Sequence, residues 1–189
     1  QAGMPDNDVL VYWPIHDFWQ KAPAKPLLPH LTIHARSWFE GQPINRVAEE
    51  LWQRGYAFDF ISDRQLAQAK FSRGKIKLPG GDYQTVVVPP CDFIPLATME
   101  KLLALAKSGA TIIFADQLPK DVPGLGELEK RRAKFQKMLT QISASAGVPQ
   151  GTRIGSGQIL VGKLQESLSQ TGIRRETMSD RDGLFHIRR

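Results

Sequence analysis

Five short apolar runs alternate with helix-like segments along this chain, and that alternation restricts the fold more than any other feature. The runs are residues 9–12, 57–61, 85–88, 110–114 and 158–161. They are rich in branched and aromatic side chains, as buried strands are. Strands that alternate with helices usually form a parallel sheet with right-handed crossovers. We therefore expect an α/β fold with a mostly parallel sheet of roughly five strands and helices on both faces.

The clearest helix is expected to begin near Pro43, because proline suits a first helical turn. Its apolar face would comprise Ile44, Val47, Ala48, Leu51 and Trp52. These residues recur at helical spacing, and Gly55 is placed to end the helix. Helices are also expected over residues 96–107, over 125–143 and from Leu164 to Gly172, with a hairpin or loop near 74–82 and a proline-rich surface excursion over 21–29.

Aromatic and ionisable side chains gather where several expected strands end. The candidate ligand or interface residues are Trp13, His16, Asp17, Trp19, Asp63 and Asp116. The first four would occupy a loop, because Pro14 cannot donate to a strand ladder and should end the first strand near Trp13. The two later aspartates follow the second and fourth strands, so they should reach the same carboxyl edge, where open α/β sheets bind ligands.

The mixture of groups at this edge suits two uses. Aromatic rings pack on the apolar face of a sugar, while carboxylates and imidazole bind its hydroxyl groups. Buried tryptophans also anchor protein interfaces. The alternative is that Trp13 and Trp19 only cover the sheet. Sequence alone leaves these interpretations open, and it cannot measure how far apart the carboxylates lie.

Cys91 is a candidate nucleophile, because it follows the third strand and is the single cysteine of the chain. A nucleophile elbow needs small neighbours around a strained turn. Here Pro90 and Phe93 are bulky, and the adjacent Asp92 would disfavour the thiolate. We therefore expect a packed, inert thiol. One cysteine also excludes a disulfide within the chain.

No cofactor and no metal site is predicted. The glycines of residues 151–157 lie too late for a dinucleotide loop and lack its third glycine, so we expect a flexible turn before an edge strand. His30 and His34 lack the acidic residue of a zinc helix. Asp6 and Asp8 lack the glycine and glutamate of a calcium loop.

The net charge of +6 raises the question of nucleic-acid binding. Four of the basic residues, Lys130, Arg131, Arg132 and Lys134, cluster on one expected helix. No aromatic residues alternate with them as a stacking platform would require, and no helix-turn-helix or zinc-finger spacing is present. We expect a solvated basic face and no nucleic-acid partner. No apolar run approaches the roughly 20 residues of a membrane span, so none is expected.

Several segments together resemble the α-L-rhamnosidase-like glycoside hydrolases of family 106. The matching segments are residues 1–19, 55–63, 83–90, 108–114, 122–124 and 183–189. The resemblance implies a flavodoxin-like three-layer sandwich, similar to a glutamine amidotransferase fold, over residues 1–182. Residues 183–189 would begin a following strand or domain. By the same resemblance, the nucleophile of amidotransferase-like proteins would lie at a position near Ala115 and Asp116. This chain has no cysteine or serine there.

The same resemblance implies a non-catalytic accessory domain, inactive by itself. It would pack on a catalytic barrel and other domains of the same parent chain and help to line the cleft for a rhamnose-containing carbohydrate. It also implies a periplasmic or secreted bacterial protein. The chain starts at Gln1 rather than Met, so we expect a piece of a longer protein. Two alternatives stay open, a stand-alone amidotransferase-like thiol enzyme using Cys91 and an independent carbohydrate-binding module.

Overall fold

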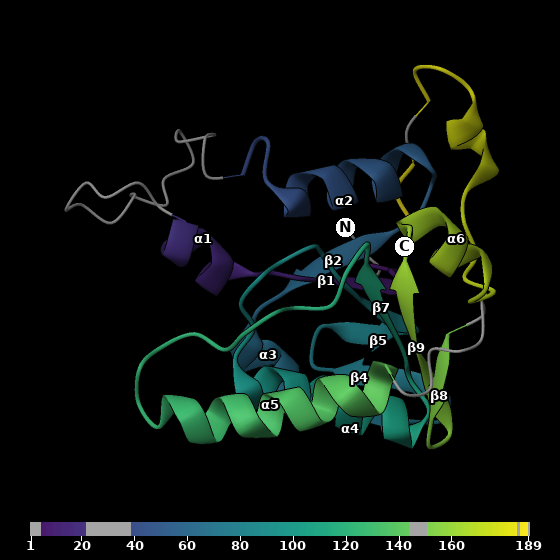
Figure 1. Ribbon diagram of the computed structural model, residues 1–189. Coiled ribbons are helices and arrows are strands. Elements are labelled where there is room, and N and C mark those ends of the chain that lie inside the picture. The colour runs from purple at the N-terminus through teal and green to yellow at the C-terminus, as the bar shows by residue number, and fades with distance from the viewer. Residues whose placement is uncertain (1–4, 22–38, 144–150, 185, 189) are drawn as a thin grey trace.

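The computed structural model describes residues 5–21, 39–143, 151–184 and 186–188. A six-stranded sheet runs through its centre in the order β2-β1-β6-β7-β9-β8 (Figure 1). The strands are β1 (Val9–Tyr12), β2 (Phe58–Ile61), β6 (Thr85–Val88), β7 (Thr111–Ala115), β8 (Thr152–Ile154) and β9 (Gly157–Gly162). All neighbours pair in parallel except β8 and β9. The prediction of a mostly parallel sheet is therefore confirmed.

The sheet has one strand more than the roughly five predicted. Residues 151–157 were expected to form a flexible turn, but β8 lies within them and folds back antiparallel along β9. The strand β9 therefore lies between β7 and β8, and the prediction that it is an edge strand was wrong. Gly155 makes the tight connection possible, because its φ of 61° is the left-handed conformation that glycine adopts without strain.

A second, three-stranded antiparallel sheet confirms the hairpin expected near residues 74–82. Its strands are β3 (Lys70–Ser72), β4 (Lys75–Leu78) and β5 (Gly81–Tyr83). Arg73 and Gly74 both have positive φ, as the type I′ turn of a two-residue hairpin requires. The Tyr83 hydroxyl donates a hydrogen bond of 2.8 Å to Asp59 on β2, which ties the small sheet to the large one.

Helices cover both faces of the large sheet (Figure 1). They are α1 (Ile15–Lys21), α2 (Pro43–Gln53), α3 (Asp63–Gln68), α4 (Leu96–Ser108), α5 (Leu128–Ser143) and α6 (Leu164–Ser169), with a 3-10 helix η2 (Thr177–Asp180) near the C-terminus. Side chains alternate along a strand. On β1, Val9 and Val11 pack in one core with α2 and α6, whereas Leu10 and Tyr12 pack in the other with α3, α4 and α5.

The helix α2 begins at Pro43, as predicted, and buries four of its five predicted apolar residues. The exception is Trp52, whose side chain is 47% exposed. Gly55 follows the helix with a φ of 81°. A Cβ at Gly55 would lie 2.2 Å from the carbonyl oxygen of Glu176, so this glycine also permits a close approach of the C-terminal segment.

Part of the sequence analysis falls outside the described residues. The proline-rich connection from residue 22 onward, His30 and His34 all lie there. The boundary between residues 182 and 183 stays a prediction. None of the helices in the described ranges is long and apolar enough to cross a membrane.

Candidate functional site

The segment after β1 is a helix and not the predicted loop. The strand ends before Pro14, as expected, but α1 begins at the next residue, Ile15. The carbonyl oxygen of Pro14 accepts hydrogen bonds from the backbone N–H groups of Asp17 and Phe18. Proline has no backbone N–H group, so it ends a strand. For the same reason it is compatible with the start of a helix, where that group would have no partner within the helix. His16, Asp17 and Trp19 therefore project from a helix.

The two tryptophans of this segment have different surroundings. The Trp13 ring stacks on Phe39, with centroids 5.9 Å apart, and meets Phe60 edge-on at 5.6 Å. It packs against the core that α2 shares with the sheet. Trp19 is 49% exposed and meets the His16 ring edge-on at 5.3 Å. Trp13 thus helps to cover the core, while Trp19 presents half of its surface to solvent.

The Asp17 carboxylate is buried and holds a loop of the same domain. Its Oδ1 accepts hydrogen bonds from the backbone N–H groups of Asp92 at 2.6 Å and Phe93 at 2.7 Å. These two residues lie between β6 and α4. Charged acceptors of this kind make the stronger class of hydrogen bond. Asp17 therefore fixes the position of the loop that leads into α4.

Asp63 lies at the start of α3, which Ser62 caps. Its Oδ1 accepts hydrogen bonds from the hydroxyls of Tyr12 at 2.8 Å and Thr98 at 2.5 Å. Its Oδ2 lies 3.5 Å from His16 Nε2. Burial raises the pKa of Asp63, but the hydrogen bonds from His16, Thr98 and Tyr12 outweigh it, so the pKa lies below its usual value. Burial, followed by the charge of Asp63, raises the pKa of Tyr12. The carboxylate is therefore stable in its charged form and the phenol in its neutral form.

Asp116 lies in a separate hollow. It follows β7 with a φ of 62°, in the left-handed conformation that aspartate adopts more readily than most residues. Its side chain is exposed and lines a hollow of about 510 Å³ between α2, α6 and the ends of β6 and β7. Arg46, Glu50 and Lys163 also line it. Asp116 is not among the partners of Asp63, so the predicted carboxylates share a sheet edge without forming one cluster.

The structure therefore divides the six predicted site residues. His16 contacts both Trp19 and Asp63. The Asp17 carboxylate binds a loop inside the fold, and Trp13 packs on the core. Asp116 lines a separate hollow. Sequence reasoning missed Thr98 as a partner of Asp63. The local sequence around Thr98 could not predict this hydrogen bond, because Asp63 lies 35 positions away in the chain.

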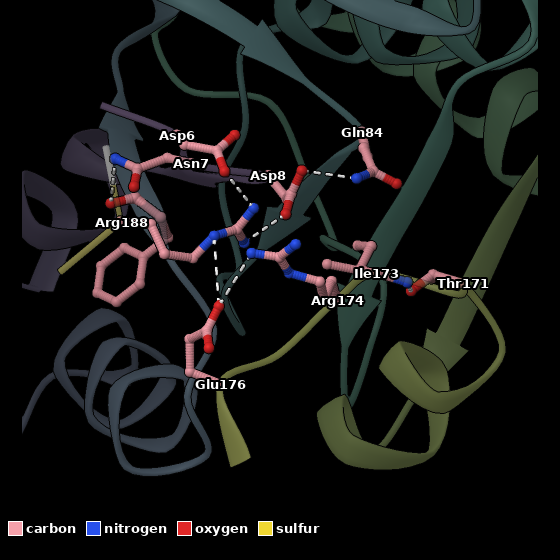
Figure 2. A network of polar contacts seen from close by, with 10 residues as sticks. Asp6, Asn7, Asp8, Gln84, Thr171, Ile173, Arg174, Glu176 and Arg188 are labelled. Carbon is pink, nitrogen blue, oxygen red and sulfur yellow. Dashed lines mark hydrogen bonds and ion pairs between the residues drawn. The ribbon is translucent and has the colours of Figure 1, made fainter. Parts of the chain in front are cut away.

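A second polar cluster lies at the amino edge of the sheet, and it surrounds Arg188 (Figure 2). The Arg188 side chain is 10% exposed, and its two terminal nitrogens lie 2.6 Å from carboxylate oxygens of Asp8 and Asp6. Its Nε lies 3.6 Å from Glu176. Burial lowers the pKa of Arg188, but the bonds to Asp8 and Asp6 outweigh it and raise the pKa overall. Asp6 and Asp8 are thus part of an ion-pair network with Arg188.

The basic residues at the start of α5 also have partners within the fold. Arg131 donates hydrogen bonds to the carbonyl oxygens of Pro123, Gly124 and Gly126. Arg132 pairs with Asp121 at 2.5 Å. These two side chains therefore hold the loop between β7 and α5. Within the described ranges, no three His, Cys, Asp or Glu side chains form a group that could hold a metal ion.

Cys91 should react slowly with an alkylating reagent at neutral pH, because its side chain is only 2% exposed. We expect iodoacetamide to modify the folded chain at least about tenfold more slowly than the same chain in denaturant, as followed by intact mass. The unfolded chain is the control, since Cys91 is the single thiol. Rapid, stoichiometric modification of the folded chain would show a reactive thiol instead.

Comparison with known proteins identifies the class of this chain. Residues 40–189 match the glycoside hydrolase family 106 profile, described as alpha-L-rhamnosidase. The chain therefore belongs to this family of glycoside hydrolases, and the resemblance seen in the sequence is confirmed.

The chain spans only a small part of the length of two similar proteins. A putative beta-glucuronidase from Formosa agariphila is 36% identical over 90 residues, which are 47% of this chain and 8% of that protein. The structure of a rhamnosidase from Novosphingobium sp. PP1Y aligns over 90% of this chain with a TM-score of 0.59 and 16% identity. The alignment covers 14% of that rhamnosidase chain. The second likeness shows a shared fold.

Proposed function

We propose that this chain is a non-catalytic accessory domain of an α-L-rhamnosidase-like glycoside hydrolase. In this proposal it packs on the catalytic barrel and other domains of the same parent chain and helps to line the cleft for a rhamnose-containing carbohydrate. The hydrolytic carboxylates would lie elsewhere in the parent. Family membership supports the glycoside hydrolase part, and the small share of each relative that the chain covers is consistent with the rest.

One observation supports the non-catalytic role: the carboxylates of Asp17 and Asp63 both bind groups of the domain itself. Glycoside hydrolysis needs two carboxyl groups that flank the sugar bond, one of them able to give up a proton near the working pH. Asp17 is buried against two backbone N–H groups. The lowered pKa of Asp63 is opposite to what a general acid requires. Both carboxylates therefore suit a role in holding the domain together.

Exposed aromatic side chains support the packing role. Trp19 on α1 and Phe60 on β2 are 49% and 41% exposed. Large aromatic residues with an exposed face are the usual anchors of protein interfaces. Trp19 also contacts His16, so the same surface offers a ring and an imidazole to a sugar.

The proposal also includes a flavodoxin-like fold and a periplasmic or secreted location of the parent protein. Counted in chain order, the five parallel strands lie in the order second, first, third, fourth, fifth, which is the flavodoxin order. This supports a flavodoxin-like domain related to the amidotransferase fold, in which Asp116 stands near the place of the nucleophile. A periplasmic or secreted parent is proposed from the family alone.

Replacing Trp19 by alanine should affect the parent hydrolase and the 189-residue chain differently. If Trp19 is an interface anchor, the melting temperature of the parent falls by about 2 °C or more, while that of the 189-residue chain hardly changes because Trp19 is half exposed there. Leu125→Ala is the control, since Leu125 is 88% exposed. Lower rhamnoside turnover with an unchanged melting temperature would assign Trp19 to the cleft instead. No change in either quantity would contradict both roles.

A further inference from the structure

The strand β2 forms one edge of the large sheet, and among the described residues only β1 lies beside it. On that side, the carbonyl oxygen of Ala57 accepts a hydrogen bond from the Val9 N–H group. The carbonyl oxygen of Ile61 accepts one from the Trp13 N–H group. Successive strand residues direct their backbone groups to opposite sides, so residues 57, 59 and 61 face β1, whereas 58 and 60 face outward.

The open part of this edge is centred on Phe60. The Phe58 carbonyl oxygen accepts a hydrogen bond of 3.3 Å from the Asn7 side chain, and the Ser62 N–H group donates to the Gln65 side chain. Within the described residues, no hydrogen bond joins the outward N–H and C=O groups of Phe60 to another part of the chain. Lysine and proline commonly protect edge strands, and β2 contains neither. Its outer side can therefore pair with a further strand.

The Phe60 side chain adds an exposed apolar surface beside the open edge. Its ring meets Trp13 edge-on at 5.6 Å, Phe58 at 5.5 Å and Phe39 at 6.0 Å. These contacts fix the position of the ring, yet Phe60 is 41% exposed. A ring that is already held in place loses little conformational freedom when a partner binds, so it suits an interface anchor.

A hollow of about 160 Å³ lies along β2 on the other face of the sheet. Ile61 of β2 and Gln65 of α3 line it, together with Leu78, Pro79 and Tyr83 of the small sheet. Pockets for small molecules usually have at least about 300 Å³. The hollow therefore suits a single apolar side chain better than a separate ligand.

The edge, the ring and the hollow together fit an added strand. Side chains alternate along a strand, so a strand beside β2 would place one side chain on Phe60 and the next over the hollow. Its backbone would pair with the outward N–H and C=O groups of Phe60. Addition of a strand to an exposed sheet edge is a recurring mode of peptide recognition.

The parent hydrolase is the source of such a strand that the comparisons support. The alignments cover only 8% and 14% of two similar proteins, so most of a parent of that size lies outside this domain. The C-terminal segment also reaches the start of β2, because Ile187 and Arg188 line the same surface hollow as Phe58. In the proposed parent, a chain that continues past these residues would start beside β2.

We propose that an extended, apolar segment of the parent hydrolase, outside residues 1–189, adds to the large sheet as a strand beside β2. The inference rests on the proposed function and deepens it, since it names how this domain is held by the rest of the parent. Phe60 supplies the backbone groups for pairing and a ring for packing. The hollow by Leu78 and Tyr83 receives one side chain of the added strand.

Amide hydrogen exchange, resolved by residue with mass spectrometry, tests the added strand. In the 189-residue chain the Phe60 amide should exchange rapidly, because it faces outward. In the full-length parent it should exchange at least about tenfold more slowly, because it donates to the added strand. The Ile61 amide faces β1 in both proteins and should be protected in both, so it is the internal control. Equal rates for Phe60 in the two proteins would overturn the proposal.

The same measurement separates other partners of the edge. Slow exchange of Phe60 in the 189-residue chain at every protein concentration would assign the edge to a segment of this chain. Slow exchange that appears only as the concentration rises would assign it to a second copy. Either result would overturn the proposal.

Phe60→Pro and Phe60→Ala separate strand pairing from packing of the ring. Both variants lose the ring, but only proline also removes the N–H group, which a strand tolerates where that group faces outward. In the parent, Phe60→Pro should lower the melting temperature by about 2 °C more than Phe60→Ala, after subtraction of any difference between the two in the 189-residue chain. Equal melting temperatures after that subtraction would assign the contact to the ring alone and overturn the strand.

Failure of this proposal differs from failure of the proposed function. Unchanged exchange at Phe60, with a lower melting temperature of the parent carrying Trp19→Ala, would remove the added strand and keep the accessory domain. A loss of turnover from a carboxylate variant would contradict the non-catalytic role and leave the exchange of Phe60 unaffected.

Discussion

Replacing Arg188 by methionine should lower the free energy of unfolding by about 3 kcal/mol, the typical loss when one partner of a buried ion pair is removed. Arg188 is 10% exposed and binds Asp6 and Asp8. Asp8 is buried, so its carboxylate would lose its charged partner while it keeps the hydrogen bond from the amide of Gln84. The effect arises from the charge left behind, because methionine retains much of the volume and the apolar contacts of the arginine stem.

Urea unfolding at neutral pH measures this loss, and Arg174→Met is the matched control. Arg174 also pairs with Glu176, but its side chain is 71% exposed, so its removal should change stability little. Adding Asp8→Asn to Arg188→Met should recover part of the stability, since it removes the stranded charge. Equal small effects of Arg188→Met and Arg174→Met would show that the Arg188 network does not stabilise the fold.

Replacing Asp17 by alanine should lower the free energy of unfolding by about 2–3 kcal/mol. The backbone N–H groups of Asp92 and Phe93 would lose their shared acceptor inside the protein. An unpaired buried donor costs about 1–3 kcal/mol, and hydrogen bonds to charged groups contribute about 1.5–3 kcal/mol. Asp17→Asn keeps an acceptor oxygen and should lose less.

Asp116→Asn is the control for Asp17, because Asp116 is exposed and asparagine tolerates its positive φ. Its melting temperature, measured by circular dichroism, should match that of the unchanged chain. A stable Asp17→Ala variant would contradict the assignment of Asp17 to the fold and would return it to the candidate ligand residues.

Much of the fold could be predicted because its signals are local. The run Val9–Tyr12 is buried on both faces, which is why it reads as continuous apolar sequence. The apolar residues of α2 recur at helical spacing, so the sequence predicts which face of the helix is buried. The strand β8 gave no such signal, because three residues between glycines resemble a turn until their pairing with β9 is known. The helix α1 was missed because Pro14 indicates both the end of a strand and the start of a helix.

The site was harder to predict, because residue type does not reveal where a side chain points. His16 and Asp17 are neighbours in sequence, yet one contacts Asp63 and Trp19 and the other binds a loop 75 positions away. Arg188 meets Asp8 across 180 positions, and nothing in the local sequence of either residue indicates the pair. Contacts over such separations depend on the tertiary fold, so they appear only in the structure.

The turnover number of the full-length parent carrying Asp63→Asn, measured on an aryl α-L-rhamnoside, tests the central claim most directly. Among the candidate carboxylates, Asp63 combines partial exposure with a histidine 3.5 Å away, so it is the strongest remaining candidate for a catalytic role. If the domain is non-catalytic, kcat per folded molecule should stay within about twofold of the unchanged parent, even where the melting temperature falls. A drop of about 100-fold or more in a folded variant, the loss expected for a general acid or base, would contradict it.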